Sequence, residues 1–238
     1  MRIRGLLFDK DGTLLDYHAS WMPLNREVAL QAAKGDAALA LRILVAAGYD
    51  PATDRVRANT PLAVGTPAEI AAAFARVIGT AEIGALESIV DGVFQTGGIK
   101  ASRLVPRARE AIVLFRQRTH RLGIATSDSA AGLATSMAPH DLMSQFDFAC
   151  AYDSGFGVKP GSGMPLAFCR ACAVQPDEIA VIGDNLHDIE MGRAAGAALV
   201  IGVLTGTSTA ADLAGHADRI YAGIAEMAAD NGFMSLLA

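Results

Sequence analysis

The chain has 238 residues, of which 52% are hydrophobic and 19% are charged, and its formal net charge is −5. This length suits one large domain, or a core domain with a smaller one attached, and the composition allows a substantial buried core. The negative charge provides no overall basic field that would attract nucleic acid, and nothing suggests a membrane-surface protein.

The cellular setting follows from the cysteines and from the apolar runs. An odd, small number of cysteines, Cys150, Cys169 and Cys172, suits a reducing compartment. Charged residues at positions 9–11 interrupt what would be the apolar stretch of a signal peptide. The longest apolar runs, such as residues 197–204, are shorter than the roughly 20 residues that cross a bilayer. We therefore expect a soluble, cytoplasmic protein without a nucleic-acid or membrane partner.

The first predicted element is a strand at residues 3–8, and a long helical stretch follows it. Residues 17–97 show helical patterns and no clear strand, with expected helices at 24–33, 37–47, 67–78 and 81–94. An insertion of this kind predicts an all-helical cap domain at residues 17–97, with the core domain formed by residues 1–16 and 98–238. Gly97 and Gly98 are a candidate hinge between the two domains.

From residue 98 onward, short apolar runs alternate with helical patterns. The expected strands are 122–125, 146–149, 179–182, 198–201 and 219–221. The expected helices are 106–118, 130–137, 165–173, 189–195 and 210–214. The alternation predicts an α/β fold with a mainly parallel sheet, in which ligands bind outside the carboxyl ends of the strands.

The first strand ends in two carboxylates that are one residue apart. Asp9 and Asp11 flank Lys10, and Gly12 permits a sharp turn after them. At a strand end both carboxylates can face the same crevice, where one can act as a nucleophile and the other as a general acid and base. Lys10 is expected to modify the local charge without a direct chemical role.

Three later strand ends carry groups that complement these carboxylates. Thr126 and Ser127 offer hydroxyl groups for phosphoryl oxygens, and Lys159 offers a cation in a glycine-rich loop. Asp184 and Asp188 add two carboxylates at the approach to a helix. If these residues share one site, the chemistry concerns a phosphoryl group.

The charges of this site predict a metal ion. Each pair of like charges about 4 Å apart costs about 4 kcal/mol at an effective dielectric constant of about 20. Lys159 alone cannot offset four carboxylates, and a phosphate ester would add more negative charge. A site made only of oxygen ligands is the preference of Mg²⁺, which we therefore expect as the cofactor.

The four segments resemble the four motifs of the haloacid dehalogenase superfamily, in the order and spacing of its phosphoglycolate phosphatase-like branch. The resemblance implies a doubly wound, Rossmann-like core with a helical cap inserted after the first motif. It also implies a Mg²⁺-dependent phosphatase that hydrolyses a small phosphate monoester, phosphoglycolate-like or a sugar phosphate, through an aspartyl-phosphate intermediate.

The resemblance also implies a role for each motif residue. Asp9 would attack phosphorus, and Asp11 would protonate the leaving oxygen and then activate water. Mg²⁺ would be held by the Asp9 carboxylate, the Asp11 backbone carbonyl and Asp184, with Asp188 acting directly or through a water molecule. Thr126 and Lys159 would bind the phosphoryl group, together with Ser127, which stands where asparagine is common in the family.

Three alternatives remain open from the sequence. A phosphomutase would share the intermediate but pass the phosphoryl group to a sugar. A haloacid dehalogenase needs neither Mg²⁺ nor a second acid at the position of Asp11, and a signalling receiver module has about half this length. The partner is expected to be a small phosphorylated metabolite, whose identity the sequence leaves open, and the chain could be a monomer or a homodimer.

Overall fold

A computed structural model of the chain describes residues 2–119 and 121–237, apart from the side chains of residues 98–101. The chain divides into two compact units. One unit runs from the N-terminus to Tyr17 and from Arg103 to the C-terminus, and the other is the segment His18–Ser102. Each unit is described separately below.

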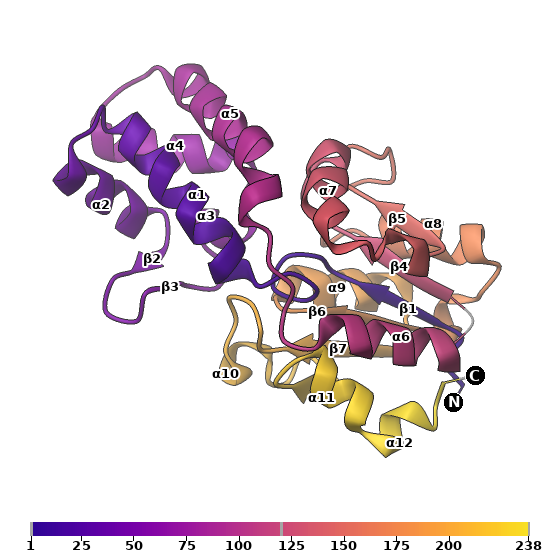
Figure 1. The fold of residues 1–238 in the computed structure, drawn as a ribbon. Helices are drawn as coiled ribbons and strands as arrows, with labels where there is room; N and C mark the ends of the chain where they lie inside the picture. Colours follow the sequence, from indigo (N-terminus) through magenta and orange to yellow (C-terminus); the bar gives the residue numbers. More distant parts are fainter. Residues whose placement is uncertain (1, 120, 238) are drawn as a thin grey trace. The chain divides into compact units, whose positions relative to one another are not determined.

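The first unit is built on a six-stranded sheet with the order β5-β4-β1-β6-β7-β8, in which every neighbouring pair is parallel. Figure 1 shows β1 at its centre, between β4 and β6. The strands are β1 (Gly5–Phe8), β4 (Arg121–Ala125), β5 (Phe148–Cys150), β6 (Ile179–Gly183), β7 (Leu199–Val203) and β8 (Arg219–Tyr221). The predicted parallel α/β sheet is confirmed. The strand expected at 146–149 begins two residues later, because a short 3₁₀ turn occupies Met143–Gln145.

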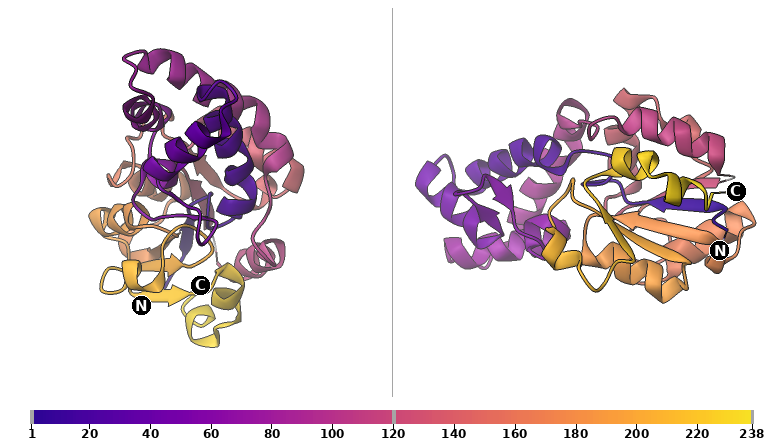
Figure 2. Two further views of the ribbon diagram at one scale, coloured as in Figure 1. Left: turned by 90° about the vertical axis from the view of Figure 1, so that its left-hand side faces the viewer. Right: turned by 90° about the horizontal axis from the view of Figure 1, so that it is seen from below.

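Alternating side chains of β1 point to opposite faces of this sheet, and each face has its own core. Leu6 and Phe8 belong to one buried cluster, which α6 (Ala108–Arg118), α7 (Ala130–Met137), α11 (Ile224–Ala229) and α12 (Asn231–Met234) complete. Leu7 belongs to the other cluster, with α8 (Gly163–Cys172), α9 (Leu186–Ala195) and α10 (Ala210–Leu213). The sheet is therefore doubly wound, with helices on both faces (Figure 2).

The second unit consists mainly of helices. They are α1 (Tyr17–Ala32), which begins at the last residue of the first unit, α2 (Ala37–Ala46), α3 (Pro61–Val64), α4 (Pro67–Ile78) and α5 (Ile83–Ala101). Two expectations for this stretch are wrong. It also contains an antiparallel pair of two-residue strands, β2 (Tyr49–Asp50) and β3 (Arg55–Val56). The expected hinge at Gly97 and Gly98 lies inside α5, so the helix continues to Ala101.

No helix within the described residues combines the length and apolar character needed to cross a membrane.

Candidate active site

The predicted site residues follow the three central strands of the sheet. Asp9 comes directly after β1, Thr126 after β4 and Asp184 after β6. Because β1 pairs in parallel with both β4 and β6, these strands end side by side, and the Asp9 amide donates to the Ile182 carbonyl at 2.8 Å. The edge of the sheet predicted for ligand binding thus carries the predicted residues.

Lys159 joins the first motif to the last one. Its Nζ lies 2.5 Å from Asp9 Oδ1 and 2.6 Å from Asp188 Oδ1, and all three side chains are buried. Burial alone would lower the pKa of Lys159, but the Asp188 and Asp9 carboxylates outweigh it and raise that pKa. Lys159 is therefore a permanent cation at the end of the sheet.

Three carboxylates gather around this lysine. Asp9, Asp184 and Asp188 each place one carboxylate oxygen within 4.8 Å of the others, and all three residues are buried. Asp184 is held by the Thr207 amide at 2.7 Å, the Thr207 hydroxyl at 3.2 Å and the Asn185 side-chain amide at 3.2 Å. Its orientation is thus fixed from two loops.

Two carboxylates of this cluster, Asp9 and Asp184, resist ionisation. Burial, and after it the neighbouring Asp188, raise the pKa of Asp184 to about 7. Burial also raises the pKa of Asp9 well above its usual range; Lys159 opposes this shift, whereas Asp188 and Asp184 add to it. With all three carboxylates ionised, Lys159 alone would leave a net negative charge at the end of the sheet. Protons on Asp9 and Asp184, or a bound cation, relieve this repulsion.

An unpaired carboxylate oxygen further supports a divalent cation at this cluster. Among the described residues, Asp9 Oδ2 is a buried oxygen without a hydrogen-bond partner. A buried, unpaired carboxylate oxygen is costly unless a cation or a substrate satisfies it. The donor set consists only of carboxylate oxygens, which suits Mg²⁺.

Asp11 lies in a different set of contacts. Its Oδ2 is 2.7 Å from the Nζ of Lys10, and the Asp9–Asp184–Asp188 group does not include it among the described residues. The family resemblance implied that the Asp11 backbone carbonyl holds the metal, and that role stays a prediction. The contact of Asp11 with Lys10 was not predicted from the sequence.

The residues predicted to bind phosphate differ in their surroundings. Thr126 is buried, its amide donates to the Cys150 carbonyl at 3.0 Å, and its hydroxyl accepts from the Asp128 amide at 3.1 Å. Ser127 is exposed at the end of β4. The phosphate contacts of Thr126, Ser127 and Lys159 stay predictions.

Sequence reasoning also missed Thr207 and Asp128. Thr207 lies in the loop after β7 and contacts Asp184 across 23 sequence positions. Asp128 forms an ion pair with Lys10 at 3.0 Å. Neither residue has a spacing that points to the site, because both contacts depend on how separate loops pack.

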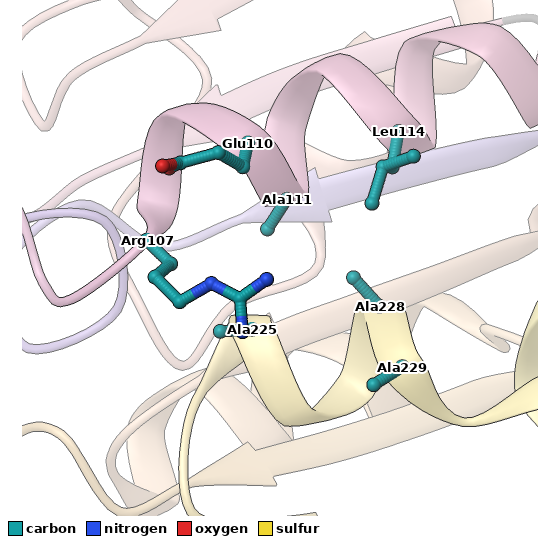
Figure 3. A pocket seen from close by; sticks show the side chains of 7 residues that line it. All are labelled: Arg107, Glu110, Ala111, Leu114, Ala225, Ala228 and Ala229. Atoms are coloured by element: carbon teal, nitrogen blue, oxygen red, sulfur yellow. The ribbon is translucent and has the colours of Figure 1, made fainter.

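A small pocket elsewhere in the same unit lies between α6 and α11 (Figure 3). Arg107 and Glu110 are its charged residues, and its other lining residues are Leu114 and four alanines, Ala111, Ala225, Ala228 and Ala229. It contains none of the residues predicted for catalysis, and its lining is mainly apolar.

The fold and the strand-end motifs define a class of doubly wound α/β proteins with an acidic cluster at the carboxyl edge of a parallel sheet. The family model of the haloacid dehalogenase-like hydrolases matches residues 3–196, so the chain belongs to that family. The predicted family and the prediction of a hydrolytic enzyme are confirmed.

Two curated relatives carry phosphatase names. The chain is 26% identical to the N-acetylmuramic acid 6-phosphate phosphatase of Pseudomonas aeruginosa, over 82% of this chain and 80% of that protein. It is 30% identical to the phosphoglycolate phosphatase of Nitrosospira multiformis, over 40% of this chain and 42% of that protein.

The fold has close counterparts among solved structures. A predicted phosphoglycolate phosphatase from Haemophilus somnus superposes with a TM-score of 0.74 at 16% identity, over 95% of this chain and 97% of the other. At this identity the likeness supports the fold alone.

Proposed function

We propose that this hydrolase is a Mg²⁺-dependent phosphatase that cleaves a small phosphate monoester through an aspartyl-phosphate on Asp9. The observation that carries the proposal is the buried Asp9 carboxylate, which has one oxygen on Lys159 and the other oxygen, Oδ2, without a hydrogen-bond partner in the part of the chain that the structure describes. A carboxylate with one oxygen anchored and the other available is suited to attack phosphorus.

The residues around Asp9 divide the work of the first step. As Asp9 forms its bond to phosphorus, the bond from phosphorus to the ester oxygen breaks, and Asp11 gives that oxygen a proton. Lys159 neutralises negative charge at Asp9, and Thr126 contributes its hydroxyl to a phosphoryl oxygen. Phosphoryl transfer depends mainly on such positioning and charge neutralisation.

The second step hydrolyses the intermediate. Asp11, now ionised, accepts a proton from water as the water oxygen attacks phosphorus, and the bond between phosphorus and Asp9 breaks. Free phosphate leaves, and both aspartates return to their starting states. Asp9, Asp184, Asp188 and the Asp11 backbone carbonyl would hold Mg²⁺, which supplies positive charge to the transferring phosphoryl group when it is bound.

Replacing the nucleophile tests this proposal. Asp9→Asn keeps the size of the side chain but removes its negative charge, so Mg²⁺-dependent hydrolysis of p-nitrophenyl phosphate should fall on the order of a thousand-fold or more. Asp177→Asn, the same change at an exposed residue, should leave the rate unchanged. In wild-type protein, acid quenching during turnover should trap one phosphoryl group on the peptide that contains Asp9, detectable by mass spectrometry.

A rate for Asp9→Asn above a few per cent of wild type, with a folded protein by circular dichroism, would contradict the assignment of the nucleophile. Activity that survives EDTA and does not respond to added Mg²⁺ would contradict the metal requirement.

The relatives' names indicate which substrates to test first. N-acetylmuramic acid 6-phosphate and phosphoglycolate should be assayed together with simple sugar phosphates. Release of free phosphate supports the phosphatase, and an isomerised sugar phosphate without release of phosphate supports the phosphomutase. The helical unit His18–Ser102 would act as a cap that selects the substrate and keeps bulk water from the intermediate.

A further inference from the structure

Lys10 is a buried lysine that the reaction above does not use. Its side chain has no exposed surface, and its Nζ lies 2.7 Å from Asp11 Oδ2, 3.0 Å from Asp128 Oδ2 and 3.1 Å from Ser136 Oγ. An ammonium group has three N–H donors, and these three oxygens can accept all of them. The position between the two proposed catalytic aspartates is therefore filled by a buried cation that contacts Asp11.

The other partners of Lys10 are themselves fixed by α7. Ser136 lies in the last turn of this helix, and Asp128 lies two residues before its start. Asp128 Oδ1 accepts from the Ser129 amide at 2.7 Å. A Cβ atom at Gly132 would lie 2.2 Å from the same oxygen, so glycine is what leaves room for the Asp128 carboxylate.

Lys10 keeps its positive charge in this arrangement. Burial alone would lower the pKa of Lys10, but Asp11 and Asp128 outweigh it and raise that pKa. Burial raises the pKa of Asp128, and Lys10 opposes that shift. Removing one partner of a buried ion pair is strongly destabilising, because it leaves the other charge buried without compensation. The contacts of Lys10 with its two carboxylates are therefore held firmly.

The two buried lysines sort the acidic residues into two groups. Lys159 binds Asp9 and Asp188, whereas Lys10 binds Asp11 and Asp128. The nucleophile and the residue proposed as acid and base thus have separate cationic anchors, although they are two positions apart.

We propose that Lys10 is a positioning residue. Asp128 and α7 fix its ammonium group, and that group holds the Asp11 carboxylate in the orientation that exchanges a proton with the leaving oxygen and with water. The inference rests on the proposed function, because it requires Asp11 to be the general acid and base. Lys10 touches neither substrate nor metal in this role and acts only through Asp11.

A double-mutant cycle tests whether Lys10 acts through Asp11. Lys10→Met should lower kcat/KM for an alkyl phosphate at least about tenfold, since a misplaced acid loses part of its usual contribution. In the Asp11→Asn background the same change should cost less than about twofold, because the carboxylate that Lys10 positions is already absent. The control is Lys34→Met, the same substitution at an exposed lysine, which should leave kcat/KM unchanged.

The leaving group provides a readout that a merely structural role would not move. A p-nitrophenolate ion leaves readily without a proton, so kcat/KM for p-nitrophenyl phosphate should fall much less than that for the alkyl phosphate. The affinity for Mn²⁺, measured by titration calorimetry, should stay within about twofold of wild type, because the Asp9–Asp184–Asp188 carboxylates keep their own anchors on Lys159 and Thr207.

The results of these experiments distinguish a failure of the positioning role of Lys10 from a failure of the proposed phosphatase mechanism. Equal losses with both substrates, or a Lys10→Met loss that is undiminished in the Asp11→Asn background, would overturn the positioning role while leaving the phosphatase intact. Full activity of Asp11→Asn would instead overturn the proposed mechanism. If Lys10→Met does not fold, Asp128→Asn, which keeps Lys10 and removes one anchor, should show the same dependence on the leaving group. A uniform loss in that variant would overturn the inference as well.

Discussion

The ionisation of Asp184 should affect the stability of the fold. Its pKa is raised to about 7 by burial and by Asp188, whereas an aspartate in an unfolded chain ionises near pH 3.9. Between about pH 4 and pH 7 the folded state keeps a proton that the unfolded state has lost. The free energy of unfolding contributed by this group therefore decreases as pH rises through that window, and the loss is complete above it.

Because this contribution to the free energy of unfolding decreases with rising pH, the melting temperature in EDTA should also decrease as the pH rises. From pH 5 to pH 8, wild-type protein should lose on the order of a few kcal/mol of stability through Asp184, at about 1.4 kcal/mol per pH unit. Asp184→Asn should show a smaller decrease in Tm by differential scanning fluorimetry, with a residual slope from Asp9, whose pKa is also raised. Added Mg²⁺ should raise the wild-type Tm more at pH 8 than at pH 5. Identical pH slopes for wild type and variant would contradict the assigned shift.

At the scale of elements, helices with local boundary signals were the most predictable. α4 spans Pro67–Ile78, the same bounds that the sequence predicts. Thr66 and Glu69 form a capping box, Pro67 occupies the first turn, and Gly79 ends the helix with a left-handed φ of 78°. All of these signals lie within a turn of the helix ends, so they can be read from neighbouring residues.

Elements that depend on packing were harder to predict. β2 and β3 have two residues each, too few for an alternating pattern to be recognised. The glycine pair Gly97–Gly98 costs roughly 1 kcal/mol per residue in a helix, but α5 continues through it. Gly97 packs so closely on Leu24 that a Cβ atom there would lie 2.2 Å from Leu24 Cδ2, a contact between distant residues that supports the helix. Local sequence could not show that balance.

The residues of the candidate site also fall into a group that could be predicted from the sequence and a group that could not. Asp9, Thr126 and Asp184 were predictable because parallel strands end at one edge of a sheet, and the charge excess there was predictable from the residue types. The pairing of Lys10 with Asp128 and the contact of Thr207 with Asp184 join loops that are distant in sequence. No periodicity or spacing encodes such contacts.

The loop after β7 provides a prediction at this scale. A Cβ atom at Gly206 would lie 1.9 Å from Asp184 Oδ2, and the Thr207 amide donates to that same oxygen at 2.7 Å. Gly206→Ala should therefore displace Asp184 and weaken Mn²⁺ binding on the order of 10–100-fold by titration calorimetry, the range typical of residues that orient metal ligands.

Gly84→Ala is the matched control for this change. Gly84 lies in α5, a Cβ atom there would meet no heavy atom within 4 Å, and alanine favours helix. This variant should bind Mn²⁺ like wild type and have an unchanged or slightly higher Tm. If both glycine variants bind Mn²⁺ equally well, the loop after β7 does not hold Asp184 in place.

At the scale of the whole molecule, the chain passes twice between the two units. The two crossings between them leave the first unit at Tyr17 and re-enter it at Arg103. Next to these points the Asp16 amide donates to the Arg103 carbonyl at 2.7 Å, and Leu15 and Leu104 form an antiparallel bridge. The first unit therefore holds the two ends of the insertion together with its own hydrogen bonds.

This closure predicts that the helical unit can be excised. Replacing residues 18–102 by a Gly-Ser linker of about four residues should leave a folded, Mn²⁺-binding core, since closing so short a loop between ends already in contact costs little entropy. If the helical unit is the cap that selects the substrate, the core should keep measurable Asp9-dependent hydrolysis of p-nitrophenyl phosphate but lose at least about tenfold in kcat/KM for a phosphorylated metabolite. The same core carrying Asp9→Asn controls for contaminating phosphatases. A folded core that retains full selectivity would show that the first unit alone recognises the substrate, and a core that cannot fold would show that its stability depends on the helical unit.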